Sequence, residues 1–210
     1  MRGFYLMIHI VVAAYALMIV PALPIAGPAR AQDAAPPSAT DTAPAPTGRA
    51  MPAGEMDDLF AELAQTEGEG WAAAESDILR EWSRSGSAVA DLLLKRGYAA
   101  LDAGDTRGAI GHLTALTEHA PGFAPGWAAR AEAFYLGGDL GPAADDLRRV
   151  LLIEPRYWPA LTQLATMLEE LGRDRAALKA YRASLAVNPH QVEAEEGVAR
   201  LRQAAEGTPV

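Results

Sequence analysis

Small residues and prolines recur at one fixed interval through the second half of the chain. Four series have a spacing of 34 residues, namely Gly104, Gly138 and Gly172; Ala109, Ala143 and Ala177; Pro121, Pro155 and Pro189; and Gly97, Ala131, Ala165 and Ala199. Independent series that share one period indicate a structural unit repeated along the chain. Such units are expected to stack on their neighbours, because one unit of this size cannot bury its apolar side chains alone.

Within each unit, apolar and small residues follow the period of an α-helix. The positions concerned in the middle unit are Trp127, Ala131 and Phe134, then Ala143, Leu147, Val150 and Leu151. Gly137-Gly138-Asp139 separates the two groups, and glycine accepts the positive φ found at helix C-termini. Glu154-Pro155 ends the second helix, because the residue before a proline avoids the α region. The pattern predicts an all-α fold built from helical hairpins.

The unit resembles the tetratricopeptide repeat, whose pattern is W-x2-L-G-x2-Y, then A-x3-F, then P. Three copies span residues 90–123, 124–157 and 158–191, within a repeat region of 88–191. The departures are Arg96 and Arg130, where the family has an apolar residue, and Leu116, where it prefers alanine. The resemblance implies a right-handed α-solenoid in which the first helix of each hairpin lines a concave, ligand-binding face.

The N-terminus has the layout of a secretory signal peptide. Arg2 is followed by an almost wholly apolar run from Phe4 to Val20, and Ala29 and Ala31 form a small-x-small cleavage site. We expect residues 1–31 to be removed on export. The alternative is an uncleaved membrane anchor, because an apolar run of this length approaches the lower limit for a bilayer span.

In both cases the rest of the chain is expected outside the cytoplasm. Lysine occurs only at Lys95 and Lys179, which together with the heavy use of alanine favours a GC-rich bacterial genome. We therefore expect a periplasmic protein, or else one anchored in the inner membrane and facing the periplasm.

Three further segments flank the repeats. Residues 32–54 have no aromatic, Ile, Leu or Val, so a disordered Ala/Pro-rich linker is expected, with a short binding motif as the alternative. Residues 55–87 predict an acidic helical hairpin, with the length of a degenerate first repeat. Its acidic residues form either a solvated outer face or a patch for a basic partner. Residues 192–206 predict a C-terminal capping helix.

Composition and motif spacing argue against several functions. The chain has no cysteine, which removes disulfides, thiolate zinc sites and cysteine nucleophiles. Its 18 basic and 27 acidic residues give a formal net charge of −9, which argues against binding to nucleic acid. His112 and His119 share a helix face, but they lack the i, i+4 spacing of a metal pair. We therefore expect no enzyme activity, no metal and no cofactor.

The candidate partner-binding residues lie on the face of the first helices that the resemblance implies to be concave. They are Leu94, Tyr98, Leu101, Glu132, Tyr135, Leu136, Thr162, Thr166, Glu169 and Glu170. The alternative is that the tyrosines and leucines are ordinary packing residues. Well-known family members grip the C-terminal carboxylate of a chaperone with Lys, Arg and Asn at matching positions, and no such set is present here. Tyrosine and glutamate suit a segment with apolar and basic side chains.

Together these observations predict a non-catalytic adaptor or scaffold of the bacterial cell envelope that binds a protein or peptide segment in the concave groove. The alternative is a membrane-anchored structural component of an envelope complex, held by its uncleaved N-terminal segment. Contact with a membrane is expected only in that second case. The identity of the partner and the oligomeric state stay open at this point.

Overall fold

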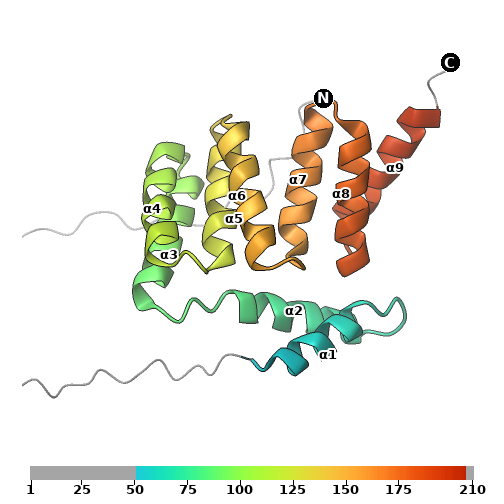
Figure 1. The fold of residues 1–210 in the computed structure, drawn as a ribbon, viewed down its shortest axis with the longest axis horizontal. Coiled ribbons are helices and arrows are strands. Elements are labelled where there is room, and N and C mark those ends of the chain that lie inside the picture. Colours follow the sequence, from blue (N-terminus) through green and yellow to red (C-terminus); the bar gives the residue numbers. More distant parts are fainter. Residues whose placement is uncertain (1–50, 207–210) are drawn as a thin grey trace, which may run out of the picture. The chain divides into compact units, whose positions relative to one another are not determined.

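The computed structural model describes residues 51–206, and this part of the chain is helical without a β-strand. Its helices are α1 (Ala53–Leu63), α2 (Gly70–Trp82), α3 (Ala88–Asp102), α4 (Thr106–His119), α5 (Ala124–Leu136), α6 (Leu140–Ile153), α7 (Trp158–Glu170), α8 (Asp174–Val187) and α9 (Val192–Glu206) (Figure 1). None of these helices has the length and apolarity needed to cross a bilayer. The expected signal peptide, 1–31, and most of the expected linker lie outside the described residues.

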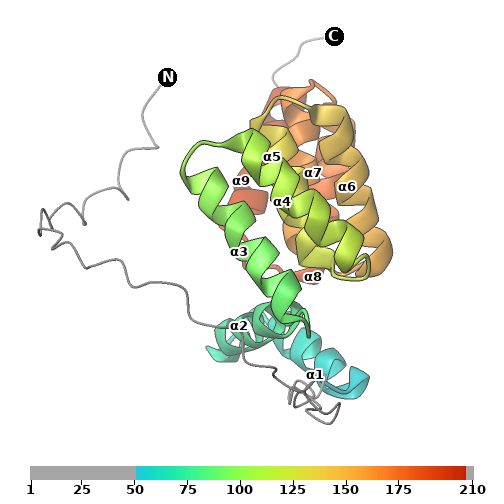
Figure 2. The same ribbon diagram turned by 90° about the vertical axis from the view of Figure 1, so that its left-hand side faces the viewer.

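Helices α3 to α9 form an array in which each helix packs on the next one along the chain. The pairs α3–α4, α5–α6 and α7–α8 are hairpins, and α9 lies against α8. Neighbouring hairpins meet through α4 and α5 and through α6 and α7, so the pairs stand side by side in chain order (Figure 1). Figure 2 views this array from its α3–α4 end. The predicted all-α solenoid of helical hairpins is confirmed.

The hairpins turn at glycines with a left-handed backbone. Gly104, Gly138 and Gly172 have φ angles of 73°, 84° and 67°. In the first hairpin the amide of Gly104 donates to the carbonyl of Leu101 at 2.9 Å. The amide of the next residue, Asp105, donates to the carbonyl of Ala100 at 2.8 Å. This pair of hydrogen bonds defines the Schellman C-cap, which favours glycine because other residues are strained at positive φ.

A second series of small residues lies where the two helices of a hairpin approach most closely. A Cβ atom built at Gly97 would lie 2.5 Å from Cδ2 of Leu113 on α4. The equivalent residues Ala131 and Ala165 have no exposed surface. A larger side chain would force the helices apart, which costs about 1–3 kcal/mol in a packed core. Close packing therefore explains this series in physical terms.

Arg130 departs from the repeat pattern, and a buried ion pair accommodates its charge. Its Nε and Nη2 atoms donate to the carboxylate of Asp146 on α6, at 2.7 and 2.8 Å. Its Nη1 atom donates to the hydroxyl of Thr117 on α4 at 3.0 Å. The guanidinium also lies over the ring of Trp127, 4.8 Å from its centroid. Arg130 therefore joins helices from two neighbouring hairpins.

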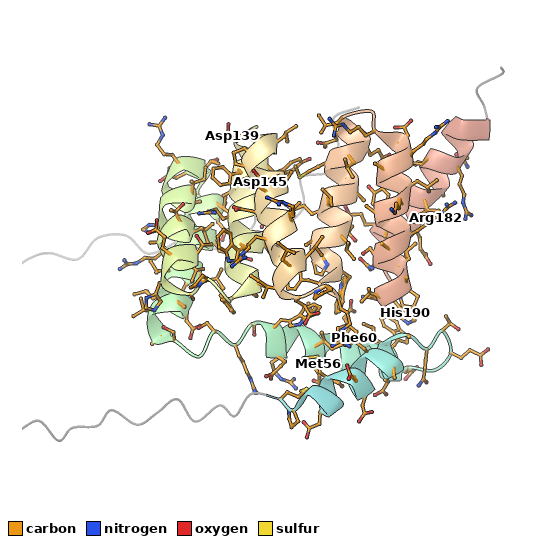
Figure 3. The ribbon with its side chains drawn as sticks, viewed as in Figure 1. Met56, Phe60, Asp139, Asp145, Arg182 and His190 are labelled. Atoms are coloured by element: carbon orange, nitrogen blue, oxygen red, sulfur yellow. The ribbon has the colours of Figure 1, made fainter. Side chains whose placement is uncertain are left out.

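Helices α1 and α2 form a separate hairpin whose apolar side meets the array. Phe60, Leu63, Ala74 and Ile78 are buried in a cluster that includes Trp158 at the start of α7. The rings of Phe60 and Trp158 meet edge-on at 6.3 Å, and Figure 3 shows Phe60 on the array side of α1. A first repeat of the array would lay α2 along α3. The apolar side of this hairpin packs against the start of α7 instead, so its placement differs from that of a repeat.

Polar and aromatic contacts hold this hairpin against the α6–α7 loop and the α8–α9 loop. Asp57 accepts a hydrogen bond from Arg156 at 2.7 Å, and Glu75 accepts one from Asn188 at 2.8 Å. The ring of Trp71 stacks on that of His190, with 3.9 Å between centroids. Two acidic residues of the segment therefore attach the hairpin to the array.

Candidate functional site

The candidate residues of α3 differ in how much of each side chain is accessible. Leu94 and Leu101 are half-buried and pack against the core shared with α4. Tyr98 lies between them in the sequence and keeps 42% of its surface exposed. Tyr98 is thus the residue of this group that a partner can reach most readily.

Tyr98 shares its surroundings with two carboxylates and a second tyrosine. Glu132 occupies the equivalent position one repeat later, on α5, which contacts α3. Burial, followed by the charge of Glu132, raises the pKa of Tyr98. Glu132 is exposed overall, but partial desolvation of its carboxyl group, followed by the charge of Asp102, raises its pKa. Burial, followed by the influence of Tyr98, raises the pKa of Tyr157, the residue before α7. We refer to Tyr98, Asp102, Glu132 and Tyr157 as the acidic–aromatic cluster.

The acidic–aromatic cluster has no cation of its own within the described part of the chain. None of the ion pairs between residues 51 and 206 involves Asp102 or Glu132. A cation brought close to Glu132 would favour its ionised form and lower its raised pKa. The faces of tyrosine rings also attract cations. The cluster is therefore suited chemically to a lysine or arginine side chain.

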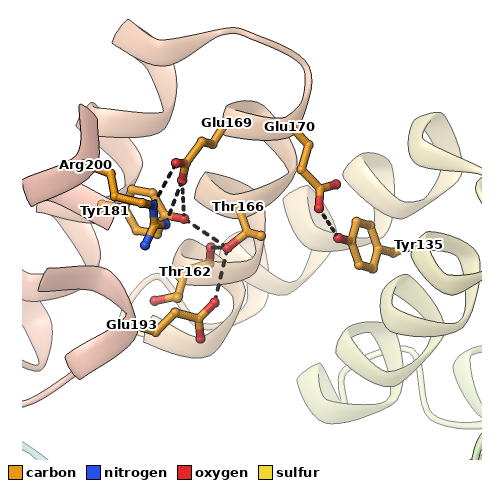
Figure 4. Close-up of polar contacts among 8 residues, drawn as sticks. All are labelled: Tyr135, Thr162, Thr166, Glu169, Glu170, Tyr181, Glu193 and Arg200. Atoms are coloured by element: carbon orange, nitrogen blue, oxygen red, sulfur yellow. Dashed lines mark hydrogen bonds and ion pairs between the residues drawn. The ribbon is translucent and has the colours of Figure 1, made fainter. Parts of the chain in front are cut away.

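Tyr135 and Leu136 lie on the same helix as Glu132, one turn later. The hydroxyl of Tyr135 donates to Oε1 of Glu170 on α7 at 2.6 Å, as Figure 4 shows. Leu136 is 58% exposed, and Glu132 is exposed as well. The second repeat thus offers a carboxylate, a phenol and an apolar side chain on neighbouring turns.

Thr162 lies inside the third repeat and is closed to a partner. It is buried, and its hydroxyl lies 2.7 Å from the hydroxyl of Ser184 on α8. The same hydroxyl donates to the side-chain oxygen of Gln191 at 2.7 Å, just before α9. Its polar group is therefore satisfied within the protein.

Thr166 and Glu169 are engaged by the last helix of the array. The hydroxyl of Thr166 donates to Glu193 at 3.3 Å, and both oxygens of Glu169 accept hydrogen bonds from Arg200 at 3.1 Å (Figure 4). The hydroxyl of Tyr181 also donates to Glu169, at 2.9 Å. The hydrogen bond from Arg200 lowers the pKa of Glu169, outweighing the opposing effect of burial. The third repeat thus directs these groups toward α9.

Three residues of this region were not foreseen from the sequence. Asp102 lies four residues after Tyr98, so helical spacing alone was sufficient to signal it. Tyr157 belongs to a loop, and its position depends on how the third hairpin stacks. The contact of Arg200 with Glu169 depends on how α9 packs on the third hairpin, which the sequence pattern does not encode. No group of three potential metal ligands occurs among the described residues.

Comparison with known proteins places the chain among repeat proteins. No protein-family model matches it. A TPR repeat-containing protein of Rhizobium etli is 30% identical over 153 residues, which make up 72% of this chain and 75% of that protein. The TPR domain of Arabidopsis OM64 has a TM-score of 0.52 at 24% identity, covering 54% of this chain and 94% of that domain.

Two further solved structures share the fold at lower identity. The first TPR of Spaghetti (RPAP3), bound to the HSP90 peptide SRMEEVD, has a TM-score of 0.54 at 21% identity and covers 56% of this chain and 94% of that one. The MamA protein has a TM-score of 0.52 at 19% identity and covers 73% of this chain and 84% of that one. At these identities the likeness is one of fold.

Proposed function

The chain belongs to the TPR repeat-containing proteins, and we propose that it is a non-catalytic adaptor that binds a segment of another protein. The proposed binding surface is the acidic–aromatic cluster, together with Tyr135 and Leu136 on α5. The observation that carries the proposal is that the exposed Asp102 and Glu132 take part in no ion pair among the described residues, although both lie near the exposed ring of Tyr98.

The chemistry of this surface selects for a basic partner segment. A lysine or arginine side chain would relieve the repulsion between Asp102 and Glu132 and would lie against the ring of Tyr98. Leu136, which is exposed, would contact an apolar side chain of the same segment. Alternating basic and apolar side chains are therefore the expected feature of the partner.

The charge of this surface is unsuited to an acidic peptide of the kind that one relative in fold binds. The peptide bound by RPAP3, SRMEEVD, carries three acidic residues. A peptide of that charge would be repelled by Asp102 and Glu132, so we propose a different class of partner for this chain. The acidic net charge of the chain supports the same choice, because it attracts basic segments over distance.

The proposed place of action is the bacterial cell envelope. The support is the sequence of residues 1–31, with its apolar run and its small-x-small site. In the soluble form of this proposal the mature protein begins at Gln32. In the alternative, the uncleaved segment anchors the array to the inner membrane as a structural component of a complex. The mass of the purified protein distinguishes the two forms.

Co-purification from the envelope fraction tests the adaptor proposal. The tagged full chain is compared with its Tyr98→Ala and Glu132→Lys variants, and retained proteins are quantified by mass spectrometry. Glu195→Lys is the matched control, because it makes the same charge change at an exposed position on α9. We expect the wild type and the control to retain one protein. The amount of that protein retained should fall at least tenfold with Glu132→Lys. Equal retention by all four proteins would contradict the proposed surface.

A further inference from the structure

Each later first helix of the array packs on the helix before it through four equivalent positions. They are Phe123, Gly126, Arg130 and Ala133 in α5; Tyr157, Ala160, Leu164 and Met167 in α7; and Gln191, Ala194, Val198 and Leu201 in α9. The first residue of each set, namely Phe123, Tyr157 or Gln191, lies just before the start of its helix. The spacing of i, i+3, i+7 and i+10 aligns the four side chains as one stripe along a helix. Helices α5, α7 and α9 thus each pack on the preceding helix through the same four-residue stripe.

The same stripe on α3 is uncovered by the described part of the chain. It consists of Val89, Leu92, Arg96 and Ala99, of which Val89 is 53% and Leu92 48% exposed. Ala99 is exposed too, whereas its equivalent Ala133 has no exposed surface. The preceding hairpin, α1–α2, packs on α7 instead. In Figure 2, which views the array from this end, α3 is seen unobstructed.

We propose that this stripe of α3 is a second binding surface, which receives one amphipathic helix of a partner protein. The chemistry of that helix follows from α4, which covers the equivalent stripe of α5. Leu116 of α4 packs against Gly126, and a Cβ atom built at that glycine would lie 3.0 Å from the leucine side chain. The hydroxyl of Thr117 accepts a hydrogen bond from Arg130. The partner helix therefore carries leucine on the buried side, next to a hydroxyl or carboxylate that accepts from Arg96.

The positive charge of this surface distinguishes it from the acidic–aromatic cluster and disfavours binding of a second copy of the chain. Arg96 and the adjacent Lys95 are exposed, and no ion pair within residues 51–206 involves either of them. The stripe therefore favours a partner helix with acidic or hydroxyl groups. Two copies of the chain that met through this stripe about a two-fold axis would bring like charges together. The observations thus favour a different protein over a second copy.

A peptide with the sequence of α4 tests the proposal directly. The probe is residues 104–121 with Gly111→Lys and Ala115→Glu joined as a lactam, because both positions are exposed on α4 and the bridge stabilises a helix. Its fluorescence anisotropy is measured against the full chain. We expect saturable binding, weakened at least tenfold by Leu92→Asp or by Arg96→Glu in the full chain. Leu152→Asp, on the 68% exposed side chain of α6, is the matched control and should bind as the wild type does.

The peptide and the assembly state supply further checks. Leu116→Ala and Thr117→Ala in the peptide should each weaken binding. Glu132→Lys in the full chain should leave peptide binding unchanged, which separates this proposal from the adaptor proposal. The proposal is overturned by the absence of saturable binding, or by binding that both Leu92→Asp and Arg96→Glu leave intact. A dimer seen by light scattering that Leu92→Asp dissociates would also overturn it, in favour of a second copy.

Discussion

Gly197 of α9 lies so close to the ring of Tyr181 on α8 that a Cβ atom at position 197 would come within 2.5 Å of the ring. Tyr181 has no exposed surface, and its hydroxyl donates to Glu169 at 2.9 Å. The ring is therefore fixed at both ends and has no room to yield. This contact docks the last helix on the third hairpin, where it also engages Thr166.

Replacing that glycine by alanine is expected to loosen α9. Gly197→Ala should lower the free energy of unfolding by about 1–2 kcal/mol, because the strain of overpacking exceeds the gain in helix propensity. Gly111→Ala on α4 is the matched control, since a Cβ there would meet nothing within 4 Å, and it should stabilise by up to about 1 kcal/mol. Urea denaturation measures both. Stabilisation by Gly197→Ala would contradict the packing described.

The ion pair of Arg130 and Asp146 gives a second prediction about stability. Arg130→Ala should cost about 3–5 kcal/mol, because it leaves the carboxylate of Asp146 buried without its partner. The third repeat carries Leu164 and Ala180 at the equivalent positions. The double variant Arg130→Leu, Asp146→Ala should therefore recover most of the loss in urea denaturation. A double variant no more stable than Arg130→Ala would show that the pair contributes more than its charges.

Attachment of the α1–α2 hairpin can be tested by limited proteolysis. Phe60→Ala removes the ring that meets Trp158, and deletion of a buried phenylalanine costs about 3–5 kcal/mol. The hairpin should detach more often, so trypsin should cleave after Arg80 and Arg84 faster than in the wild type. Leu79→Ala, at an exposed side chain of α2, is the control and should be cleaved at the wild-type rate. Equal rates for all three proteins would contradict the attachment.

Glu132 should make the protein less stable as the pH rises. Its folded-state pKa is raised above the ordinary value of 4.5, so the folded state binds its proton more tightly than the unfolded state does. Stability falls as the pH rises from 4.5 through the raised pKa and stays lower above it. Glu132→Gln should therefore raise Tm at pH 7 and leave Tm unchanged at pH 3.5. A lower Tm at pH 7 would show that the carboxylate is stabilised by a group of this protein.

Glu169 should have the opposite effect on how the stability of the protein depends on pH. The hydrogen bond from Arg200 lowers its pKa below 4.5, so its ionised form stabilises the fold. This contribution is fully present above pH 4.5 and is lost as the pH falls through the lowered pKa. Glu169→Gln should lower Tm at pH 7, and the difference should shrink as the pH falls through that lowered pKa. Thermal melts at several pH values measure it, and an unchanged Tm at pH 7 would contradict the role of the pair.

The array was predictable because its signals are local. Gly104, Gly138 and Gly172 are needed for a backbone angle that the turn imposes, and Gly97 is needed for close contact with Leu113. Both requirements act within one hairpin, so they repeat with the period of the sequence. A departure such as Arg130 was visible in the sequence, but its partner Asp146 became identifiable only with the fold.

The candidate surface was predictable only in part, because it depends on long-range placement. The helical period put Thr162 and Thr166 on the same face as Tyr98, but it carried no information about where α9 would lie. The hairpin contact of Trp71 with His190 joins residues more than a hundred positions apart, and no local pattern encodes such a pairing. Stacking decides which side chains of a periodic face stay accessible.

The most direct test of the adaptor proposal places a photo-crosslinking amino acid on the proposed surface in living cells. Position 132 on α5 is compared with position 182 on α8, where Arg182 is also exposed (Figure 3). The account predicts that irradiation links one partner protein to position 132 and that the linked segment is rich in lysine or arginine. It predicts no such product from position 182. A partner linked only at 182, or an acidic segment linked at 132, would contradict it.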